Sequence, residues 1–285
     1  MSKLLDDLLA EVRLVDEKIR KTAGVAWYRG HCNADWPLVS TLHRHVHRLS
    51  VDTSVKDDPA ELREILRGEY RTLYRQFKNE AWPLLSDRER SEWGLIFAMQ
   101  HYGIPTRLLD WTESAGCALF FAQQGRVKGD RAAIWVLDPE RLNELTIGQN
   151  GIVTFDETTS GGDIDGRPWH PRFKQPENDL PTVAVAPLFA NARMTAQRSK
   201  FTLSGDSFLP LNEQADGRLV NEHILVKIEI PPELFDELDD YLRVAGLRAF
   251  AFMPDFEGLR LEHEARVMRT LREIESFNRA AVKNP

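Results

Sequence analysis

The first 24 residues carry the hydrophobic pattern of an amphipathic helix. Apolar side chains recur three or four positions apart, at 4, 5, 8, 9, 12 and 14. That spacing predicts a helix over residues 3–22. Gly24 is the glycine expected just past its last turn.

Further along the chain, helical and strand patterns alternate unevenly. Helices are predicted over 59–80, from Ser86 and Asp87 to Gly103, and over 112–124, 231–247 and 257–281. Short apolar runs predict strands at 25–30, 105–111, 131–139, 182–189, 200–205, 223–231 and 248–255. Residues 141–182 show little pattern, which favours a loop insertion. Helices dominate the first half and strands the second, so the order predicts an α+β domain with an N-terminal helical region.

Composition narrows the class of protein. The chain has 285 residues, is 42% hydrophobic and has a formal net charge of −7, which disfavours non-specific binding to a phosphate backbone without excluding a local basic site. Its two cysteines, Cys32 and Cys117, allow neither a disulfide framework nor a zinc spacing. Acidic residues interrupt the apolar N-terminal stretch, so no signal peptide is predicted, and no run is long enough to span a bilayer. We therefore expect a cytoplasmic protein without a membrane partner.

The first candidate for ligand chemistry is the segment Trp27–Gly30, "WYRG". Arg29 at the end of an apolar strand presents a fork of donors that suits a pyrophosphate or a carboxylate. Gly30 allows another backbone or a ligand to approach closely. Taken alone, the segment favours a structural salt bridge to one of the 44 acidic residues over a ligand contact.

A denser polar cluster follows in "QHYGIPTRLLDWT", residues 100–112. Its candidate ligand-contacting side chains lie within one helix–strand–helix junction: Gln100, His101, Thr106, Arg107, Asp110 and Thr112. A self-contained network in which Asp110 pairs with Arg107 and caps the helix is the alternative. The density of polar groups favours a ligand wall over capping alone.

A third candidate is "NARMTAQRSKF", residues 191–201. Arg193 and Gln197 are four residues apart, so on a helix they would share one face. On the lead-in to a strand near Lys200 they would instead face a cleft. Acidic and histidine residues occur without metal-binding spacing, and we expect no metal.

In order and spacing these motifs resemble the FRG-domain family. The resemblance rests on "YRG" with a following W-x-L turn, then the 100–112 segment, "ALFFA", "RMTAQRSKF" and "FMPDFEGL". It covers residues 27–259, with 1–24 as an N-terminal helix and 260–285 as a C-terminal helix, so one domain over 1–285 is expected. Ser199 stands where the family usually has glycine.

The order of parts is also similar to an ADP-ribosyltransferase. That resemblance implies a split, mostly antiparallel sheet, with NAD as the substrate. Arg29 and Gly30 would grip NAD, Thr106–Thr112 would precede the A-x-x-F helix, and Gln197 would stand at the position of the usual catalytic glutamate. It implies catalytic roles for Arg29, His101, Asp110 and Gln197. The expected NAD contacts are Arg29, Gly30, Gln100, His101, Thr106, Arg107, Thr112 and Arg193.

The resemblance implies a bacterial toxin or phage-defence effector that modifies a protein or a nucleic acid, with an antitoxin or regulator as a possible partner. Arginines at 63, 67, 71 and 75 offer one candidate nucleic-acid contact, although neighbouring glutamates favour a solvated face. Two other classes stay open. One is a non-catalytic module that binds a nucleotide or a protein. The other is a nuclease using Asp110, Asp255 and Glu264.

Overall fold

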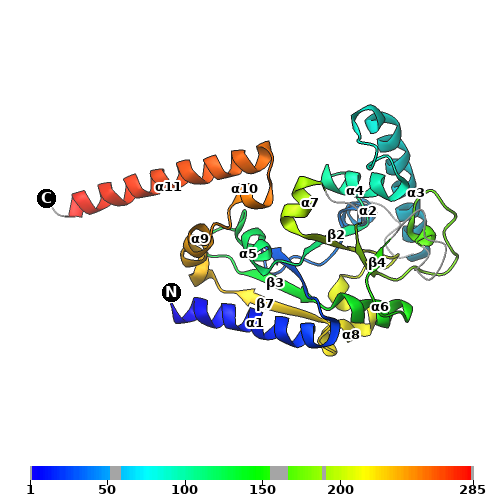
Figure 1. Cartoon of the computed structure of the whole chain (residues 1–285), viewed down its shortest axis with the longest axis horizontal. Coiled ribbons are helices and arrows are strands. Elements are labelled where there is room, and N and C mark those ends of the chain that lie inside the picture. Colours follow the sequence, from blue (N-terminus) through cyan, green and yellow to red (C-terminus); the bar gives the residue numbers. More distant parts are fainter. Residues whose placement is uncertain (1, 52–58, 155–165, 188–190, 284–285) are drawn as a thin grey trace.

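The computed structural model describes residues 2–51, 59–154, 166–187 and 191–283. They form a mixed α+β structure around one seven-stranded sheet in the order β4-β5-β6-β2-β1-β3-β7 (Figure 1). Neighbouring strands are antiparallel except β4 and β5. The mostly antiparallel sheet and its helices confirm the predicted class.

The strands are β1 (Trp27–His31), β2 (Leu108–Thr112), β3 (Ala132–Leu137), β4 (Val153–Thr154), β5 (Val183–Ala186), β6 (Ser199–Leu203) and β7 (Leu225–Ile230). The α-helices are α1 (Lys3–Ala23), α2 (Thr41–Val51), α3 (Pro59–Ala81), α4 (Glu92–His101), α5 (Ala115–Gln123), α6 (Pro139–Ile147), α7 (Ala192–Gln197), α8 (Arg218–Asn221), α9 (Phe235–Val244), α10 (Ala249–Phe252) and α11 (Phe256–Lys283). Short 3-10 turns are η1 (Trp82–Leu84), η2 (Arg167–Trp169), η3 (Leu211–Glu213), η4 (Ala215–Gly217) and η5 (Pro232–Leu234).

The centre of the sheet is its weakest join. β1 and β2 share the single ladder pair Tyr28–Thr112. In contrast, every residue of β1 pairs with β3 and every residue of β2 pairs with β6. The two halves, β4-β5-β6-β2 and β1-β3-β7, therefore belong to one sheet but part beyond that pair. Residues after Tyr28 on β1 and before Thr112 on β2 flank the opening.

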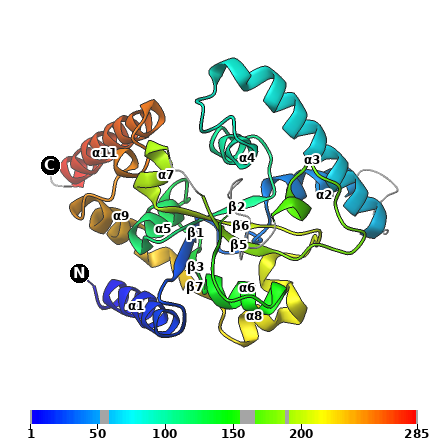
Figure 2. The same cartoon turned by 45° about the vertical axis from the view of Figure 1, so that its right-hand side comes forward.

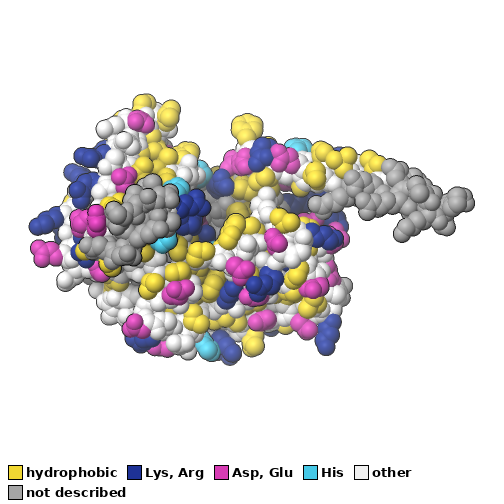
Figure 3. All heavy atoms as spheres, turned by 180° about the vertical axis from the view of Figure 1, so that it is seen from behind, with side chains coloured by type: hydrophobic (Ala, Val, Ile, Leu, Met, Phe, Trp, Pro, Cys, Tyr) yellow, Lys and Arg dark blue, Asp and Glu magenta, His cyan; other side chains and the backbone are white. Residues whose placement is uncertain are grey.

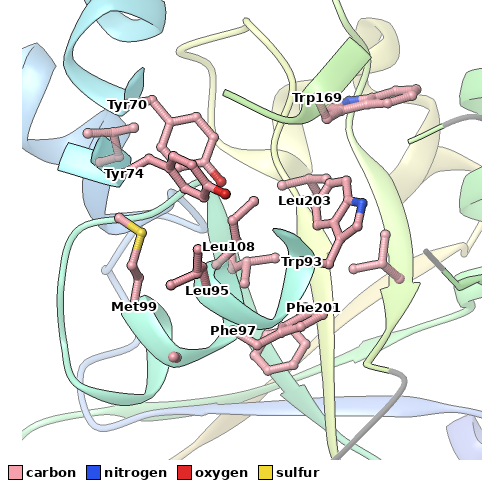
Figure 4. Packing of buried hydrophobic residues seen from close by; sticks show 14 of the residues in the cluster. Tyr70, Tyr74, Trp93, Leu95, Phe97, Met99, Leu108, Trp169, Phe201 and Leu203 are labelled. Atoms are coloured by element: carbon pink, nitrogen blue, oxygen red, sulfur yellow. The ribbon is translucent and has the colours of Figure 1, made fainter. Parts of the chain in front are cut away.

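Helices cover the two halves of the same sheet face separately. α1, α5 and α9 pack on β1, β3 and β7 through a core that includes Leu8, Tyr28 and Ile134. α2, α3 and α4 pack on β2, β5 and β6 through a second core with Phe97 and Phe201 (Figure 4). The opposite face is filled by tryptophans of the sheet with side chains of α6 and α8.

Local sequence signals account for most helix ends. The Ser2 hydroxyl accepts a hydrogen bond from the Leu5 amide at the start of α1, and Gly24 ends that helix with φ 70°. Ser114 caps α5 in the same way. The predicted start of α4 at Ser86 and Asp87 is wrong, because Ser91 caps the helix and 86–90 form turns.

Two other predictions are also wrong. The expected strand at 248–255 contains the helix α10, because its buried side chains Ala249, Phe252 and Met253 follow the helical spacing of three and four. The supposed loop at 141–182 contains most of α6, which Asp138 caps, and β4. Residues 155–165 of that segment lie outside the described residues.

α11 extends along one side of the molecule and carries the C-terminal end of the described chain beyond the body (Figure 1). Seen from behind, acidic and basic side chains are interspersed over the surface rather than sorted into one field (Figure 3). Within the described ranges, no helix combines the length and apolarity required to cross a membrane.

Candidate functional site

A pocket of about 680 Å³ lies where the two sheet halves part. α4 and α5 flank it and α7 contributes a third side; Figure 2 shows these helices around β1 and β2. Eight of the ten residues that the sequence singled out line this one pocket: Arg29, Gly30, Gln100, His101, Asp110, Thr112, Arg193 and Gln197. Sequence segments more than 160 residues apart therefore meet at one place.

Arg29 spans the opening between the sheet halves. Its Nη1 donates to the main-chain oxygen of Asp110 at 2.7 Å, and its Nε donates to Nε2 of His31 at 3.0 Å. Nη1 also lies 3.8 Å from the Asp110 carboxylate, and the side chain is 21% exposed. Burial, together with the neighbouring Arg44 charge, lowers the pKa of Arg29 against the opposing effect of Asp110. Hydrogen bonds from Nε and Nη1 therefore hold the guanidinium in place, while Arg29 still lines the pocket.

His31 is a neutral partner of Arg29. Burial and the Arg29 charge lower the pKa of this imidazole to about 3. A neutral ring whose Nε2 accepts a hydrogen bond carries its proton on Nδ1. His31 therefore orients Arg29 without adding charge to the pocket.

Asp110 is the only carboxylate among the described residues that line the pocket. Its Oδ2 accepts a hydrogen bond from Nε2 of Gln100 at 2.8 Å. The Asp110 side chain is nevertheless 58% exposed. Asp110 is thus held from behind by Gln100 and remains accessible to a ligand.

Gly30 is required by helix packing. A Cβ at this position would lie 2.0 Å from the Ala118 carbonyl oxygen and 2.5 Å from the Ala122 nitrogen of α5. The close approach expected of Gly30 is therefore that of another backbone. It draws α5 onto β1 and sets the width of the pocket.

The hydroxyl of Thr112 holds two walls of the pocket together. It donates to the main-chain oxygen of Gln197 at the end of α7, and it accepts from the amide of Ser114 at 3.0 Å. Its donor is already used within the protein. Thr112 therefore contributes to the pocket mainly as a brace between α7 and the start of α5.

Arg193 supplies the second guanidinium. Nη2 donates to the Met253 sulfur at 3.0 Å, and Nη1 lies 3.8 Å from the Asp255 carboxylate. Asp255 in turn accepts a hydrogen bond from the Gly258 amide. The "FMPDFEGL" segment thus acts at the pocket by orienting Arg193, and α7 brings both Arg193 and Gln197 to the site.

Two predicted ligand contacts do not line the pocket. Arg107 is fully buried, and its Nη2 bonds Oδ1 of Asp206 at 2.7 Å. Thr106 is also fully buried and bonds Gln100 and the Leu108 amide. Burial separates Arg107 and Thr106 from the pocket in which the other predicted NAD contacts lie. The alternative pairing of Asp110 with Arg107 is wrong, because Arg107 pairs with Asp206. Alternation along the strand turns Arg107 away from Asp110, toward a partner 99 residues further on.

Two of the four arginines along α3, at 63, 67, 71 and 75, are bound within the protein. Arg67 is buried against Asp206, and Arg63 pairs with Asp179. Arg67 further donates to two main-chain carbonyls. These two side chains hold the 176–179 segment against α3, so Arg63 and Arg67 are not free for a nucleic acid, and a contact through the exposed Arg71 and Arg75 stays a prediction.

Several residues that line the pocket were not predicted from the sequence as site residues. Trp36 and Phe121 line the pocket as aromatic walls, and Trp36 is 53% exposed. His101, which the sequence did single out, is neutral because burial and then Arg193 lower its pKa. Both cysteines also line the pocket, and burial raises the pKa of Cys117 to about 12, so that thiol is not a nucleophile. Only the W-x-L turn gave a signal for Trp36.

A second hollow of about 800 Å³ lies between α9, α10 and α11. It contains none of the predicted site residues. Its Arg126 donates to main-chain carbonyls of Asp130, Ile230 and Pro231, which is a structural role. In the part of the chain that the structure describes, no group of three or more His, Cys, Asp or Glu side chains is arranged to hold a metal ion.

The part of the chain that contains β1, α4, β2 and α5 matches a known protein family. Residues 24–131 match the family model described as the FRG domain. The chain carries an FRG domain. Searches of curated proteins and of solved structures gave no significant match.

The FRG match ends before the pocket does. Its 24–131 segment holds Arg29, Gln100 and Asp110 on β1, α4 and β2. Arg193 and Gln197 come from α7, outside the matched segment. The pocket is therefore built by the FRG domain together with the chain that follows it, and the expected extension of the family over 132–259 stays a prediction.

Proposed function

We propose that this FRG-domain protein is an ADP-ribosyltransferase-like enzyme that uses NAD as its substrate. The observation that carries the proposal is the meeting of Arg29, Asp110 and Gln197 in one pocket at the parting of the sheet. In the resemblance, the first strand supplies the arginine, the second supplies small hydroxyl residues and the third begins with the catalytic position. The split sheet of that enzyme class belongs to the same proposal.

Charge in the pocket supports a phosphate-bearing ligand. Arg29 and Arg193 line it, and Arg44 lies close enough to Arg29 to lower its pKa. Each lining arginine has its carboxylate at 3.8 Å, a loose pair that leaves donors for an incoming anion. This local excess of positive charge contrasts with the net charge of −7. A pyrophosphate would satisfy both forks.

Size and wall chemistry agree with a dinucleotide. A volume of about 680 Å³ lies within the range of pockets that bind cofactor-sized molecules. Aromatic walls from Trp36, Phe97 and Phe121 offer flat apolar surface for a ring. His101 and Gln197 add polar groups that can contact ribose hydroxyls.

The chemistry required of the pocket is cleavage of the bond between nicotinamide and ribose. That reaction passes through an oxocarbenium-like state, which a nearby negative charge stabilises. Asp110 is the carboxylate placed to do this, Arg29 and Arg193 would hold the pyrophosphate, and Gln197 would bond the ribose. The acceptor is a macromolecule, protein or nucleic acid. A cytoplasmic role as a bacterial toxin or phage-defence effector follows from the family resemblance.

Nicotinamide release and calorimetry test the proposal together. We expect the protein, mixed with NAD carrying a label on its adenine and with cell lysate, to release nicotinamide and to transfer label to macromolecules. Asp110→Asn should still bind NAD but lose turnover. An unchanged NAD pool and the absence of binding heat would contradict the proposal.

One observation favours a second candidate, a non-catalytic nucleotide-binding module. Gln197 stands where the resemblance places a glutamate, and Asp110 already accepts a bond from Gln100. A binder would give binding heat with NAD and no nicotinamide. The same two measurements therefore separate the candidates.

A further inference from the structure

Thr106 lies behind the pocket wall and is linked to Asp110 through one side chain. Its side chain is fully buried. The Leu108 amide donates to Thr106 Oγ1 at 3.0 Å, and Thr106 Oγ1 donates to Oε1 of Gln100. Gln100 Nε2 then donates to Oδ2 of Asp110 at 2.8 Å. A continuous chain of hydrogen bonds thus runs from the backbone of β2 to the pocket carboxylate.

The direction of each bond in this chain is determined. The Leu108 N–H occupies an acceptor position of Thr106, and the Thr106 hydroxyl has one proton, which goes to the Gln100 oxygen. An ionised carboxylate only accepts. Gln100 must therefore present its NH₂ group to Asp110, because the reversed amide would place its oxygen against the carboxylate, with two acceptors facing each other.

We propose that Thr106 and Gln100 are positioning residues that hold the Asp110 carboxylate in its reactive orientation. The inference rests on the proposed function and assigns to these two residues a role other than binding NAD. A carboxylate fixed before the substrate arrives stabilises developing positive charge without reorganising. Arg29 fixes the same residue from the other side through its main-chain oxygen.

Two variants of Thr106 separate positioning from packing. Thr106→Val keeps the shape and removes the hydroxyl, so Gln100 loses its orienting donor. Thr106→Ser keeps the hydroxyl. We expect Thr106→Val to lower kcat about 10- to 100-fold with the NAD dissociation constant changed less than about 2-fold, and Thr106→Ser to retain most of the activity.

Gln100→Met covers the case in which Thr106→Val folds poorly, and a double-mutant cycle tests whether the two residues act through one chain. Gln100→Met removes the donor to Asp110 while keeping the length of the side chain. Its loss of kcat should match that of Thr106→Val, and the double variant should lose little more, since both changes break one chain. Additive losses would overturn the proposal.

A readout without turnover keeps this inference distinct from the proposed function. In NMR spectra, the two Nε2 protons of Gln100, assigned by comparison with Gln100→Met, should be well separated and exchange slowly in wild type and Thr106→Ser. In Thr106→Val they should move to free-amide positions. Failure of wild type to bind or cleave NAD would contradict the proposed function alone. Unchanged Gln100 protons, or an unchanged kcat in Thr106→Val, would overturn the positioning role.

Discussion

Arg29 donates from Nη1 to the main-chain oxygen of Asp110 at 2.7 Å, across the place where β1 and β2 part. The arginine therefore replaces a ladder hydrogen bond as well as facing the pocket. Substitution of Arg29 should therefore change both the affinity for a ligand and the unfolding free energy. It makes Arg29 both a ligand-binding candidate and a link between the two halves of the sheet.

Arg29→Ala should weaken NAD binding by about 1.5–3 kcal/mol, because a charge-assisted pair with the pyrophosphate is lost. Unfolding free energy should fall by about 1 kcal/mol with the bond to Asp110. Arg29→Lys keeps the charge without the fork, so binding should be impaired here as well. Calorimetry with NAD and denaturant titration measure the two effects. A large stability loss with unchanged NAD affinity would make Arg29 a structural residue.

Gly30→Ala should destabilise the protein by about 1–3 kcal/mol or more, because its Cβ would collide with the α5 backbone at Ala118. The matched control is Gly68→Ala on α3, where a Cβ meets nothing within 4 Å. Chemical denaturation of both variants provides the comparison. Equal stability in the two would show that α5 does not pack on β1 as described.

Asp206→Asn should destabilise the fold without directly altering the pocket. Burial alone raises the pKa of this carboxyl, but hydrogen bonding from Arg67 and the Arg107 charge outweigh it and hold the pKa below its usual value. Neutralising Asp206 removes the buried counter-charge of Arg107 and leaves Arg67 with the exposed Glu64, and breaking a buried ion pair typically costs about 3–5 kcal/mol. Asp179→Asn, which breaks an exposed pair with Arg63, should cost far less, because water screens that pair. Equal losses in the two variants would contradict the buried network.

Acid should destabilise this protein before its carboxylates titrate. Burial is the main cause that lowers the pKa of His31 and His43 to about 3 and that of His170 to about 4. These rings are neutral in the folded state, whereas the unfolded chain binds protons below about pH 6.5. The unfolding free energy should therefore fall as the pH drops from about 6.5 to 4, by about 1.4 kcal/mol per pH unit for each histidine.

Denaturant titrations at several pH values measure that slope. His43 accepts or donates at Ser40 and at the Gly205 carbonyl, so His43→Asn preserves polarity and removes one titrating group. The variant should lose one histidine's share of the slope, about 1.4 kcal/mol per pH unit. A flat profile between pH 6.5 and 4.5 would mean that these imidazoles are protonated in the folded protein.

Much of the pocket was predictable because many of its polar residues lie close together in the sequence. The run from Gln100 to Thr112 combines polar groups with flanking apolar helices, and Gly30 beside Arg29 marks a close approach. Which of these groups reach the pocket was not predictable. Arg107 turns away toward Asp206, and Thr106 acts through Gln100, because burial and partners far along the chain decide both.

The same limit applies to the fold. Caps such as Ser2 and Ser114 act within three residues, so sequence reveals them. The segment "AFAF" alternates small and aromatic residues, which is typical of a strand, whereas the packing of Phe252 against Phe120 favours the helix α10. The parting of β1 from β2 depends on how both sheet halves pair with their outer neighbours, which no local pattern records.

Nicotinamide release by wild type and by Asp110→Asn tests the central claim most directly. Both proteins are incubated with NAD and cell lysate, and free nicotinamide is quantified, with bound NAD measured by calorimetry on the same preparations. The pocket described here predicts release by wild type only and comparable NAD binding by both. Equal release from the two proteins, or no release with no binding by wild type, would contradict it.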